Sequence, residues 1–551
     1  MSAADLRRDS VWWGWGRTDG RPTLGAGAKQ MLAEELGETE GVEAVPIESV
    51  ALPAAQPLSG AVLDAAGGEG AVSTTAEDRL RHAAGKSYPD LVRVRAGSPS
   101  GAPDAVLAPT SAESVGAVLA TCSAQQVVVV PFGGGTSVVG GVEPLRANFG
   151  RLVSLDLTGL RAVSVDERSQ TATLGPGLRG PEAESALNAR GYTLGHFPQS
   201  FPYATIGGFA ATRSAGQAST GYGRFDELVT SVTMQTPQGP ISTLQTPHTA
   251  AGPALRELII GSEGTLGVIT EVTVRIRPKP DTRRYEGWFA PGFEEGIEIG
   301  RALSQGGVEP DIFRLSNRDE TRVSLALAGL GGFRKRALES YLGLRRRSEG
   351  CMVIVGWEGD PGSVDRRREL SAALLRSGGA VPLGRSAGNS WEHGRYEGPY
   401  MRDALMDAGV MVETLETSHT YSRIDGLYTA VRSALHEAMA GQGAPGIVMC
   451  HVSHLYRDGA SLYFTFLSAR RPGAEIDQWH AVKSAACEAI VATGGTITHH
   501  HGVGRDHAGY MTAEVGELGI AALGAVKDRL DPAGIMNPGK LLPTDLAPSQ
   551  G

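Results

Sequence analysis

The stretch Pro131-Phe132-Gly133-Gly134-Gly135-Thr136-Ser137 follows the β-branched run Val127–Val130, which is typical of a buried strand. Three successive glycines let backbone N–H groups come within hydrogen-bonding distance of an anion. The hydroxyls of Thr136 and Ser137 add further donors. A flexible surface turn is the alternative interpretation. The strand before the glycines and the hydroxyls after them favour a phosphate-binding loop.

A second glycine motif, Gly175-Pro176-Gly177-Leu178-Arg179-Gly180, fits the G-x-G-x-x-G pattern of dinucleotide-binding folds. That fingerprint also requires an acidic residue about 20 positions later. Here the corresponding residues are Gln-Ser-Phe-Pro at 199–202, and after Glu184 the next acid is Asp226. We therefore set NAD aside and interpret the motif as a turn that leads into a helix.

Two further segments are dense in small residues. The segment 205–216 can make room for a large planar group, although close packing of another backbone explains its composition equally well. The segment 261–270 is a glycine-rich turn that runs directly into a strand.

Three successive histidines, His499, His500 and His501, precede Gly502. On an extended segment His499 and His501 would point one way and His500 the other. Neutral imidazole can act as a base, donate a hydrogen bond or bind a metal. We assign no metal; such a site would need partners elsewhere, for which His451 and His454 are candidates. A polar turn with incidental histidines is the alternative.

Composition excludes several classes of protein. The chain has 551 residues and a net charge of -9, which disfavours a nucleic-acid surface. Its 4 cysteines lie far apart without a CxxC pair, which argues against a zinc ribbon or a disulfide framework. No apolar run approaches the ~20 residues of a membrane span, and the N-terminus lacks the apolar core of a signal peptide. We expect a cytoplasmic enzyme.

Hydrophobic patterns divide the chain into two lobes. The first lobe extends to about residue 280, with strands expected at 127–130, 152–157, 171–174, 229–235 and 268–276 and helices at 111–123 and 181–190. The second lobe alternates helices and strands, expected at 293–305, 352–357, 425–440 and 461–467. The Ala-, Gly- and Pro-rich stretch 51–75 is interpreted as a loop or linker.

Together these motifs resemble the FAD-binding family of vanillyl-alcohol oxidase or p-cresol methylhydroxylase (PCMH) type, and within it the alkyldihydroxyacetonephosphate synthases. The resemblance covers nearly the whole chain and includes Trp15-Gly16, Gly195-His196, Tyr400–Asp403, Tyr463-Phe464 and His499–Gly504. It implies an α+β fold with a two-subdomain, PCMH-type FAD-binding domain and an α+β cap domain. The implied boundaries are an N-terminal segment and linker at 1–85, the FAD domain at 86–280, the cap at 281–510 and a helical tail returning to the FAD domain at 511–551.

The resemblance also implies site residues. FAD would be held without a covalent bond, since the loop at Pro131 has no His or Cys. Arg402 would bind the anionic end of a substrate. The reacting residues would be Tyr463, His499, His500, His501 and His196. The FAD-binding residues would be Pro131, Phe132, Gly133, Gly134, Gly135, Thr136, Ser137, Gln199, Ser200, Phe201, Pro202, Tyr203, Ala204, Thr205, Thr212, Arg213, Ser214, Ala215, Glu263, Gly264, Thr265, Leu266, Gly267, Val268, Ile269 and Arg314.

The implied activity is the exchange of the acyl group of acyl-dihydroxyacetone phosphate for a fatty alcohol, through an adduct at the flavin N5, in ether-lipid synthesis. Two alternatives stay open: an FAD-dependent oxidase or dehydrogenase of a D-2-hydroxy acid such as lactate or glycolate, and a non-catalytic flavin-binding scaffold. We expect a small-molecule or lipid substrate, no nucleic acid and a homodimer. Peripheral contact with a membrane is left open.

Overall fold

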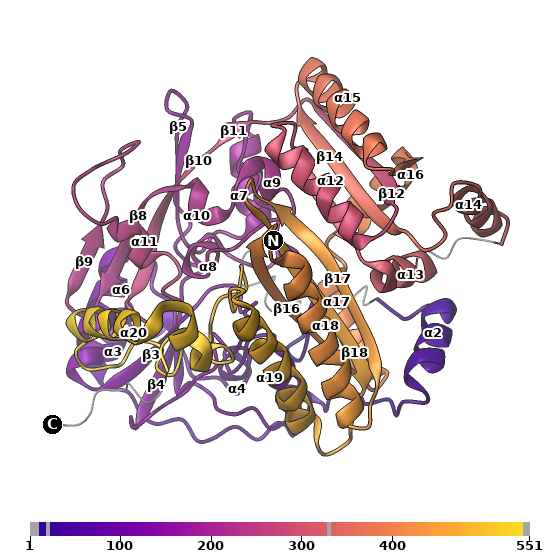
Figure 1. Cartoon of the computed structure of the whole chain (residues 1–551). Coiled ribbons are helices and arrows are strands. Elements are labelled where there is room, and N and C mark those ends of the chain that lie inside the picture. Colours follow the sequence, from indigo (N-terminus) through magenta and orange to yellow (C-terminus); the bar gives the residue numbers. More distant parts are fainter. Residues whose placement is uncertain (1–9, 18–21, 328–331, 544–551) are drawn as a thin grey trace.

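The computed structural model describes residues 10–17, 22–327 and 332–543. The chain forms two lobes (Figure 1), which we call the FAD lobe and the cap lobe after the domains that the resemblance implies. They meet along one large cavity. Figure 1 shows the violet and magenta elements on the left and the salmon and orange cap on the right, with the yellow C-terminal segment along the violet elements. The indigo helix at Ala26–Leu36 lies on the cap side.

A four-stranded sheet carries the glycine loop. Its strand order is β1-β2-β4-β3, in which β2, β4 and β3 are parallel: β1 (Val72–Ser73), β2 (Ala105–Leu107), β4 (Arg151–Asp156) and β3 (Val127–Phe132). Helix α6 (Ala112–Ala124) precedes β3, and the Ser111 hydroxyl caps it by accepting the N–H of Ser114 at 3.1 Å. Because α6 and β3 bury Val115, Val118 and Val129 completely, the strand ends rigidly where the glycines begin.

The second sheet of the FAD lobe is antiparallel. Its order is β5-β6-β10-β8-β9: β5 (Val163–Asp166), β6 (Thr171–Leu174), β10 (Val268–Arg275), β8 (Val229–Thr236) and β9 (Gly239–Ser242). The predicted strands of this lobe are confirmed to within one or two residues. The motif Gly175–Gly180 is a turn between β6 and helix α7 (Gly180–Asn188). Because β6 pairs only with antiparallel neighbours, this motif does not belong to a parallel dinucleotide-binding unit.

The stretch 51–75 is not simply a linker. It contains helix α3 (Gly60–Ala66), capped by the Ser59 hydroxyl and ended by Gly67 in a left-handed conformation. Val62 and Ala66 are buried in the core formed by α6 and the parallel sheet. The interpretation as a linker was wrong because the small apolar residues pack against α6.

The cap is built on a seven-stranded antiparallel sheet. Its order is β15-β12-β14-β13-β17-β18-β16: β15 (Val381–Gly384), β12 (Thr282–Ala290), β14 (Cys351–Gly359), β13 (Ile312–Ser316), β17 (Gly446–Leu455), β18 (Gly459–Ala469) and β16 (Val410–Thr420). The helices and strands predicted for this lobe are confirmed with small shifts of their ends. Strands β12, β13, β15, β16 and β17 were not predicted.

Four long helices cover one face of the cap sheet (Figure 1): α12 (Phe293–Gln305), α15 (Pro361–Ser377), α18 (Ile424–Gly441) and α19 (Glu475–Thr493). The other face of β16, β17 and β18 lines the cavity through alternate residues, because side chains alternate across a strand. Shorter helices close this side, namely α2 (Ala26–Leu36), α13 (Arg318–Leu327), α16 (Arg385–Gly394) and α17 (Gly398–Asp407). None of the helices in the described part of the chain is both long and apolar enough to span a bilayer.

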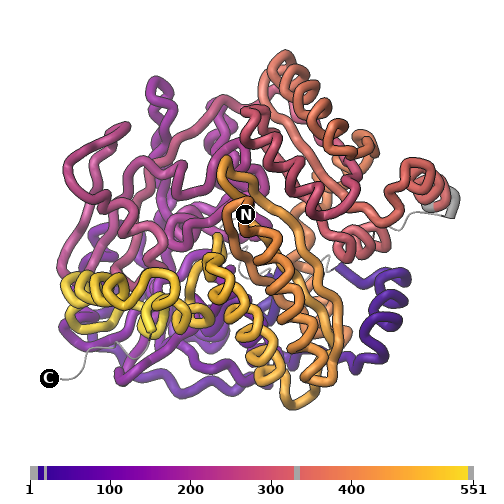
Figure 2. The backbone as a smooth tube through the Cα atoms, in the orientation of Figure 1, coloured from indigo at the N-terminus to yellow at the C-terminus, as the bar shows by residue number. Residues whose placement is uncertain are grey.

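The C-terminal segment returns to the FAD lobe (Figure 2). Helix α20 (Met511–Leu530) is followed by a short extended stretch beside β3. The backbone of Val129 donates to the carbonyl of Ile535 at 3.0 Å and accepts the N–H of Asn537 at 3.0 Å. The side chain of Asn537 also binds the carbonyl oxygens of Gly141 and Glu263, so this stretch ties the glycine loop to the 261–270 turn.

Candidate active site

The glycine loop lies flat against the segment 203–205. A Cβ atom on Gly134 would stand 2.2 Å from the carbonyl oxygen of Tyr203, and one on Gly133 would stand 2.4 Å from the Thr205 hydroxyl. Gly135 has φ +64, a conformation that favours glycine. Within the described residues, the amide N–H groups of 133–137 donate to no other part of the chain. The loop therefore offers free donors for an anion.

The glycine loop opens into a cavity of about 620 Å³ between the two lobes. Most of the predicted FAD-binding residues line it: Pro131, Phe132, Gly133, Gly134, Gly135, Thr136, Ser137, Gln199, Ser200, Ala204, Thr205, Thr212, Ser214, Ala215, Glu263, Gly264, Gly267, Val268, Ile269 and Arg314. Sequence segments that are far apart thus form strips around one space that is large enough for an extended ligand.

Six predicted FAD-binding residues do not line the cavity: Phe201, Pro202, Tyr203, Arg213, Thr265 and Leu266. Leu266 is buried in the core of the antiparallel sheet, and Phe201 packs edge-on against Phe197. Arg213 turns away to bind the carbonyl oxygens of Glu257 and Ile260. The prediction took each motif as a continuous strip, whereas these side chains pack against neighbouring residues or bond to the backbone outside the cavity.

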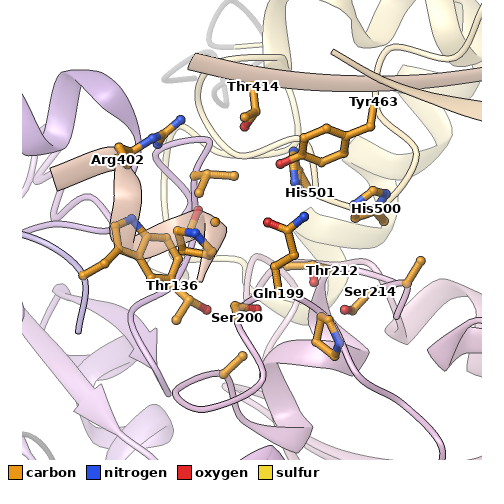
Figure 3. Close-up of a pocket in the computed structure, with 18 of the residues that line it drawn as sticks. Thr136, Gln199, Ser200, Thr212, Ser214, Arg402, Thr414, Tyr463, His500 and His501 are labelled. Carbon is orange, nitrogen blue, oxygen red and sulfur yellow. The ribbon is translucent and has the colours of Figure 1, made fainter. Parts of the chain in front are cut away.

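The predicted reacting residues meet on the cap side of the cavity. Figure 3 shows Tyr463, His500 and His501 together, with the amide of Gln199 directed toward them from the FAD lobe. Tyr463 lies on β18, where its ring stacks on His451 at 4.8 Å between centroids and meets His501 edge-on at 5.4 Å. Burial raises the pKa of Tyr463 to about 12, so its phenol is neutral at physiological pH.

Glu416 holds the histidine segment in place. Its Oε1 accepts the backbone N–H groups of His499, His500 and His501 at 3.1, 2.7 and 2.5 Å. Burial alone would raise the pKa of Glu416, but His501, His500 and these N–H groups hold that pKa well below its usual value. Sequence reasoning missed this residue; the apolar run Val410-Met411-Val412, typical of a buried strand, was the available signal beside it.

The predicted alternation of the three histidines is wrong. His500 and His501 both line the cavity, whereas His499 does not. Three successive N–H groups converge on one oxygen of Glu416, which bends the chain and abolishes the alternation of an extended strand. His501 reaches the same carboxylate, with 3.3 Å between its Nδ1 and Oε2.

The structure does not bring His196 into the cavity. Its side chain is 0% exposed and packs between the rings of Phe209 and Phe225. Its Nε2 is 3.1 Å from the hydroxyl of Ser214, which does line the cavity. Burial lowers the pKa of His196 to about 3. His196 therefore lies behind the cavity wall and not at the reacting centre.

Arg402 lines the cavity from α17, across from the histidines (Figure 3). Its guanidinium donates to the carboxylate of Glu413 at 2.7 Å and to the carbonyl of Lys86 at 2.9 Å. A guanidinium has five N–H donors, so further donors remain for a ligand. Arg314 is also held by an acid, Glu320, which binds His451 Nδ1 at 3.1 Å.

One part of the cavity is apolar. Helices α2 and α13 pack together over strand β17 at this end. Its lining side chains come from these helices, from the residues just before α2, from α17 and from the cap strands: Leu24, Ala28, Met31, Leu32, Val323, Leu327, Leu405, Val412, Met449 and Leu467. We call this part the apolar arm.

Comparisons with known proteins agree with this geometry. A family model described as "FAD binding domain" matches residues 103–245, and one described as "FAD linked oxidases, C-terminal domain" matches residues 279–541. An alkyldihydroxyacetonephosphate synthase of Trypanosoma brucei brucei is 35% identical over 475 residues, which are 85% of this chain and 77% of that protein. The chain belongs to the alkyldihydroxyacetonephosphate synthase family.

Solved structures support the same assignment. A structure of an alkyldihydroxyacetonephosphate synthase superposes with a TM-score of 0.84 at 29% identity, covering 98% of this chain and 100% of that one. Substrate-bound p-cresol methylhydroxylase superposes with a TM-score of 0.64 at 14% identity, covering 90% of this chain and 99% of that one. The predicted α+β, PCMH-type fold is confirmed, as is the resemblance to the synthases.

The protein is an FAD-dependent enzyme of this family. Its own residues fit the cofactor: the free N–H groups of the glycine loop suit the pyrophosphate. A Cβ on Gly134 would lie 2.2 Å from the Tyr203 carbonyl oxygen, and a Cβ on Gly207 would lie 2.6 Å from Pro176. Two segments that line the cavity therefore need glycine at these positions. The loop contains no His or Cys, and non-covalent binding stays our prediction.

Proposed function

We propose that the enzyme exchanges the acyl group of acyl-dihydroxyacetone phosphate for a fatty alcohol, a step of ether-lipid synthesis. The observation that carries this proposal is that one cavity joins the FAD-binding strips, the Tyr463–His500–His501 group and the apolar arm. A small D-2-hydroxy acid such as lactate has no alkyl chain that could fill the apolar arm. A long acyl or alkyl chain does, because burying each CH₂ group contributes about 0.8 kcal/mol.

The chain's own residues suit each part of such a substrate. Bound FAD would supply an electron-accepting ring. The donors of Arg402 left over by Glu413 and Lys86 suit phosphate oxygens, which the planar guanidinium binds in pairs. Tyr463 and His500 stand on the cap side of the cavity, where a neutral phenol and a neutral imidazole can move protons.

The apolar arm also supports an entry route for lipid. It reaches Leu327, whose side chain is 51% exposed and belongs to α13. We infer that a fatty alcohol enters between α2 and α13 from a membrane in peripheral contact with this end of the cavity. A cytoplasmic location and a homodimer remain predictions.

The direct test is an assay with purified holoenzyme, hexadecanol and palmitoyl-dihydroxyacetone phosphate, with product detected by mass spectrometry. We expect the alkyl ether and one equivalent of palmitate. Leu32→Glu, which places a charge in the apolar arm, should raise KM for long alcohols, whereas Glu34→Gln on the exposed side of α2 should not. Absence of ether, with oxidation of a 2-hydroxy acid, would contradict the proposal.

A further inference from the structure

A second cavity of about 420 Å³ borders the histidine segment. Its lining residues are mostly polar and come from β16, the Tyr456–Gly459 turn, the end of α19 with the residues that follow it, and the start of α20: Ser418, His419, Thr420, Tyr456, Asp458, Gly459, Val491, Gly494, Gly495, Thr496, Ala513 and Glu514. Tyr456 is half-buried, so it connects this cavity to the interior.

A continuous line of hydrogen bonds runs from this second cavity to the cavity of about 620 Å³ between the two lobes. We call that larger cavity the reaction cavity. The Tyr456 hydroxyl is 2.6 Å from Nε2 of His499. Nδ1 of His499 is 2.9 Å from Nδ1 of His500. His500 lines the reaction cavity, and its ring stacks near that of Tyr463 with 6.0 Å between centroids.

Arg224 gives this line a direction. Its guanidinium lies beside the Tyr456 hydroxyl and can only donate hydrogen bonds. The tyrosine oxygen therefore accepts from Arg224, and its own hydrogen points to Nε2 of His499. Because Nε2 of His499 accepts this hydrogen, and a neutral imidazole has only one N–H, the hydrogen of the His499 ring is on Nδ1. This N–H donates to Nδ1 of His500. The N–H of His500 is then on Nε2.

Two observations support neutral rings with fixed hydrogens. Burial holds the pKa of both His499 and His500 well below the usual value. The adjacent His454 must donate from Nε2 to the carbonyl of Gly216, at 2.9 Å, and its Nδ1 is 3.1 Å from the Ser461 hydroxyl. Both ring nitrogens of His454 are thus engaged by Gly216 and Ser461, so His454 does not compete for the bond between His499 and His500.

We propose that Tyr456, His499 and His500 form a proton relay from the second cavity to the reaction cavity, with Arg224 as the positioning residue that sets its direction. The relay rests on the proposed acyl exchange. His500 Nε2 gives its proton to the departing carboxylate, the His499 Nδ1 proton moves to His500 Nδ1, and the Tyr456 proton moves to His499 Nε2. The tyrosinate beside Arg224 takes a proton from water in the second cavity, which leaves a hydroxide there. The entering alcohol gives its proton to Nε2 of His500, the same line of hydrogen bonds passes a proton back to Tyr456, and Tyr456 returns one to the hydroxide, so the net proton count is unchanged and no electron moves.

The direction of the relay can be tested without turnover. In holoenzyme labelled with ¹⁵N-histidine, the ring ¹⁵N shifts should show His499 with its proton on Nδ1 and His500 with its proton on Nε2. Assignments come from His499→Gln and His500→Gln. Tyr456→Phe should shift the His499 signals, whereas Tyr421→Phe should not, because the Tyr421 hydroxyl donates to the backbone carbonyl of Tyr456 at 2.9 Å. A His499 proton on Nε2 would overturn the direction.

The role in turnover has its own readout. Tyr456→Phe should lower kcat by about 10- to 100-fold at unchanged KM. Its solvent deuterium isotope effect should exceed that of the wild type, since proton delivery becomes rate-limiting. Tyr421→Phe should match the wild type in both. An unchanged kcat and isotope effect in Tyr456→Phe would overturn the relay. If the wild type makes no ether, the proposed function fails, and the tautomer measurement still decides the arrangement of hydrogens.

Discussion

The carboxylate of Glu416 accepts the backbone N–H of His500 at 2.7 Å, although 84 residues separate them in the chain. Glu263 does the same for the next turn, since its two oxygens accept the N–H groups of Val503 and Gly504 at 2.7 and 2.8 Å. Two buried acids, one from each lobe, thus fix the backbone that carries the histidines predicted to react. The hydrogen bonds that hold the histidine segment therefore form only when both lobes are folded.

Removing the Glu416 acceptor should disorganise the histidine segment. We expect Glu416→Ala to lower the free energy of unfolding by about 3 kcal/mol, because several buried N–H groups lose their partner. Chemical denaturation measures the stability, and the ether assay should show loss of turnover. Glu514→Gln is the matched control, since Glu514 is exposed and binds the N–H of Ile497 in the same segment. Equal stability of Glu416→Ala and wild type would contradict this account.

A methyl group on Gly134 should abolish FAD binding. Its Cβ would stand 2.2 Å from the backbone carbonyl oxygen of Tyr203. Because a Cβ and a carbonyl oxygen are both fixed by the backbone, no rotamer change can relieve this clash. We expect Gly134→Ala to purify colourless, as measured by the ratio of absorbance at 450 and 280 nm. Gly150→Ala meets no atom within 4 Å and should stay yellow. Full FAD occupancy in Gly134→Ala would show that the cofactor lies elsewhere.

Loss of the Tyr463 hydroxyl should affect chemistry and not cofactor binding. We expect Tyr463→Phe to retain FAD and to lose about 10²- to 10⁴-fold in kcat, the range for removal of a general acid or base. Stopped-flow and steady-state measurements check the rate. Tyr428→Phe is a suitable control, because Tyr428 stacks on Phe464, the next residue of β18, which faces the opposite side of the sheet. Equal kcat in Tyr463→Phe and wild type would remove the phenol from the reaction.

Asp403 should make stability depend on pH. Burial raises the pKa of Asp403 from 3.8 to about 6, and one of its oxygens accepts the N–H of Trp15 at 2.7 Å. Between these two pH values the folded state holds a proton that the unfolded state has lost. The contribution of Asp403 to the free energy of unfolding therefore falls by about 2–3 kcal/mol as the pH rises through this window.

Asp403→Asn should remove that part of the slope, as measured by urea denaturation between pH 4 and 7. The amide oxygen can still accept the Trp15 N–H, so the fold is preserved. Asp365→Asn, an exposed acid on α15, should leave the slope unchanged. Identical slopes in Asp403→Asn and wild type would contradict the raised pKa.

Local patterns explain why the glycine loop and the strands around it were predictable. The strand, the three glycines and the two hydroxyls of Pro131–Ser137 are contiguous, and their physics does not depend on distant residues. The helix after Ser111 and the strands of the antiparallel sheet also follow from local pattern. Other elements depend on tertiary contacts. The small residues of 60–66 are typical of a linker in sequence, but they form a helix that packs against α6.

The arrangement of the histidines on the cap side of the cavity depends on contacts between segments far apart in the chain. The direction of each histidine is set by Glu416, Tyr456 and the bend between them. His196 looked equivalent to the other histidines, but Phe209 and Phe225 bury it. A sequence pattern can name the residue types of such a site, whereas their directions require the folded structure.

The central claim is that bound FAD serves an acyl exchange with no net oxidation. An anaerobic titration of the holoenzyme with palmitoyl-dihydroxyacetone phosphate, followed by hexadecanol, tests it through the flavin spectrum. We predict a spectral change on addition of the first substrate, full return of oxidised FAD on addition of the alcohol, and one ether formed per cycle without an electron acceptor. Permanent bleaching of FAD by a D-2-hydroxy acid, with no ether formed, would contradict the claim.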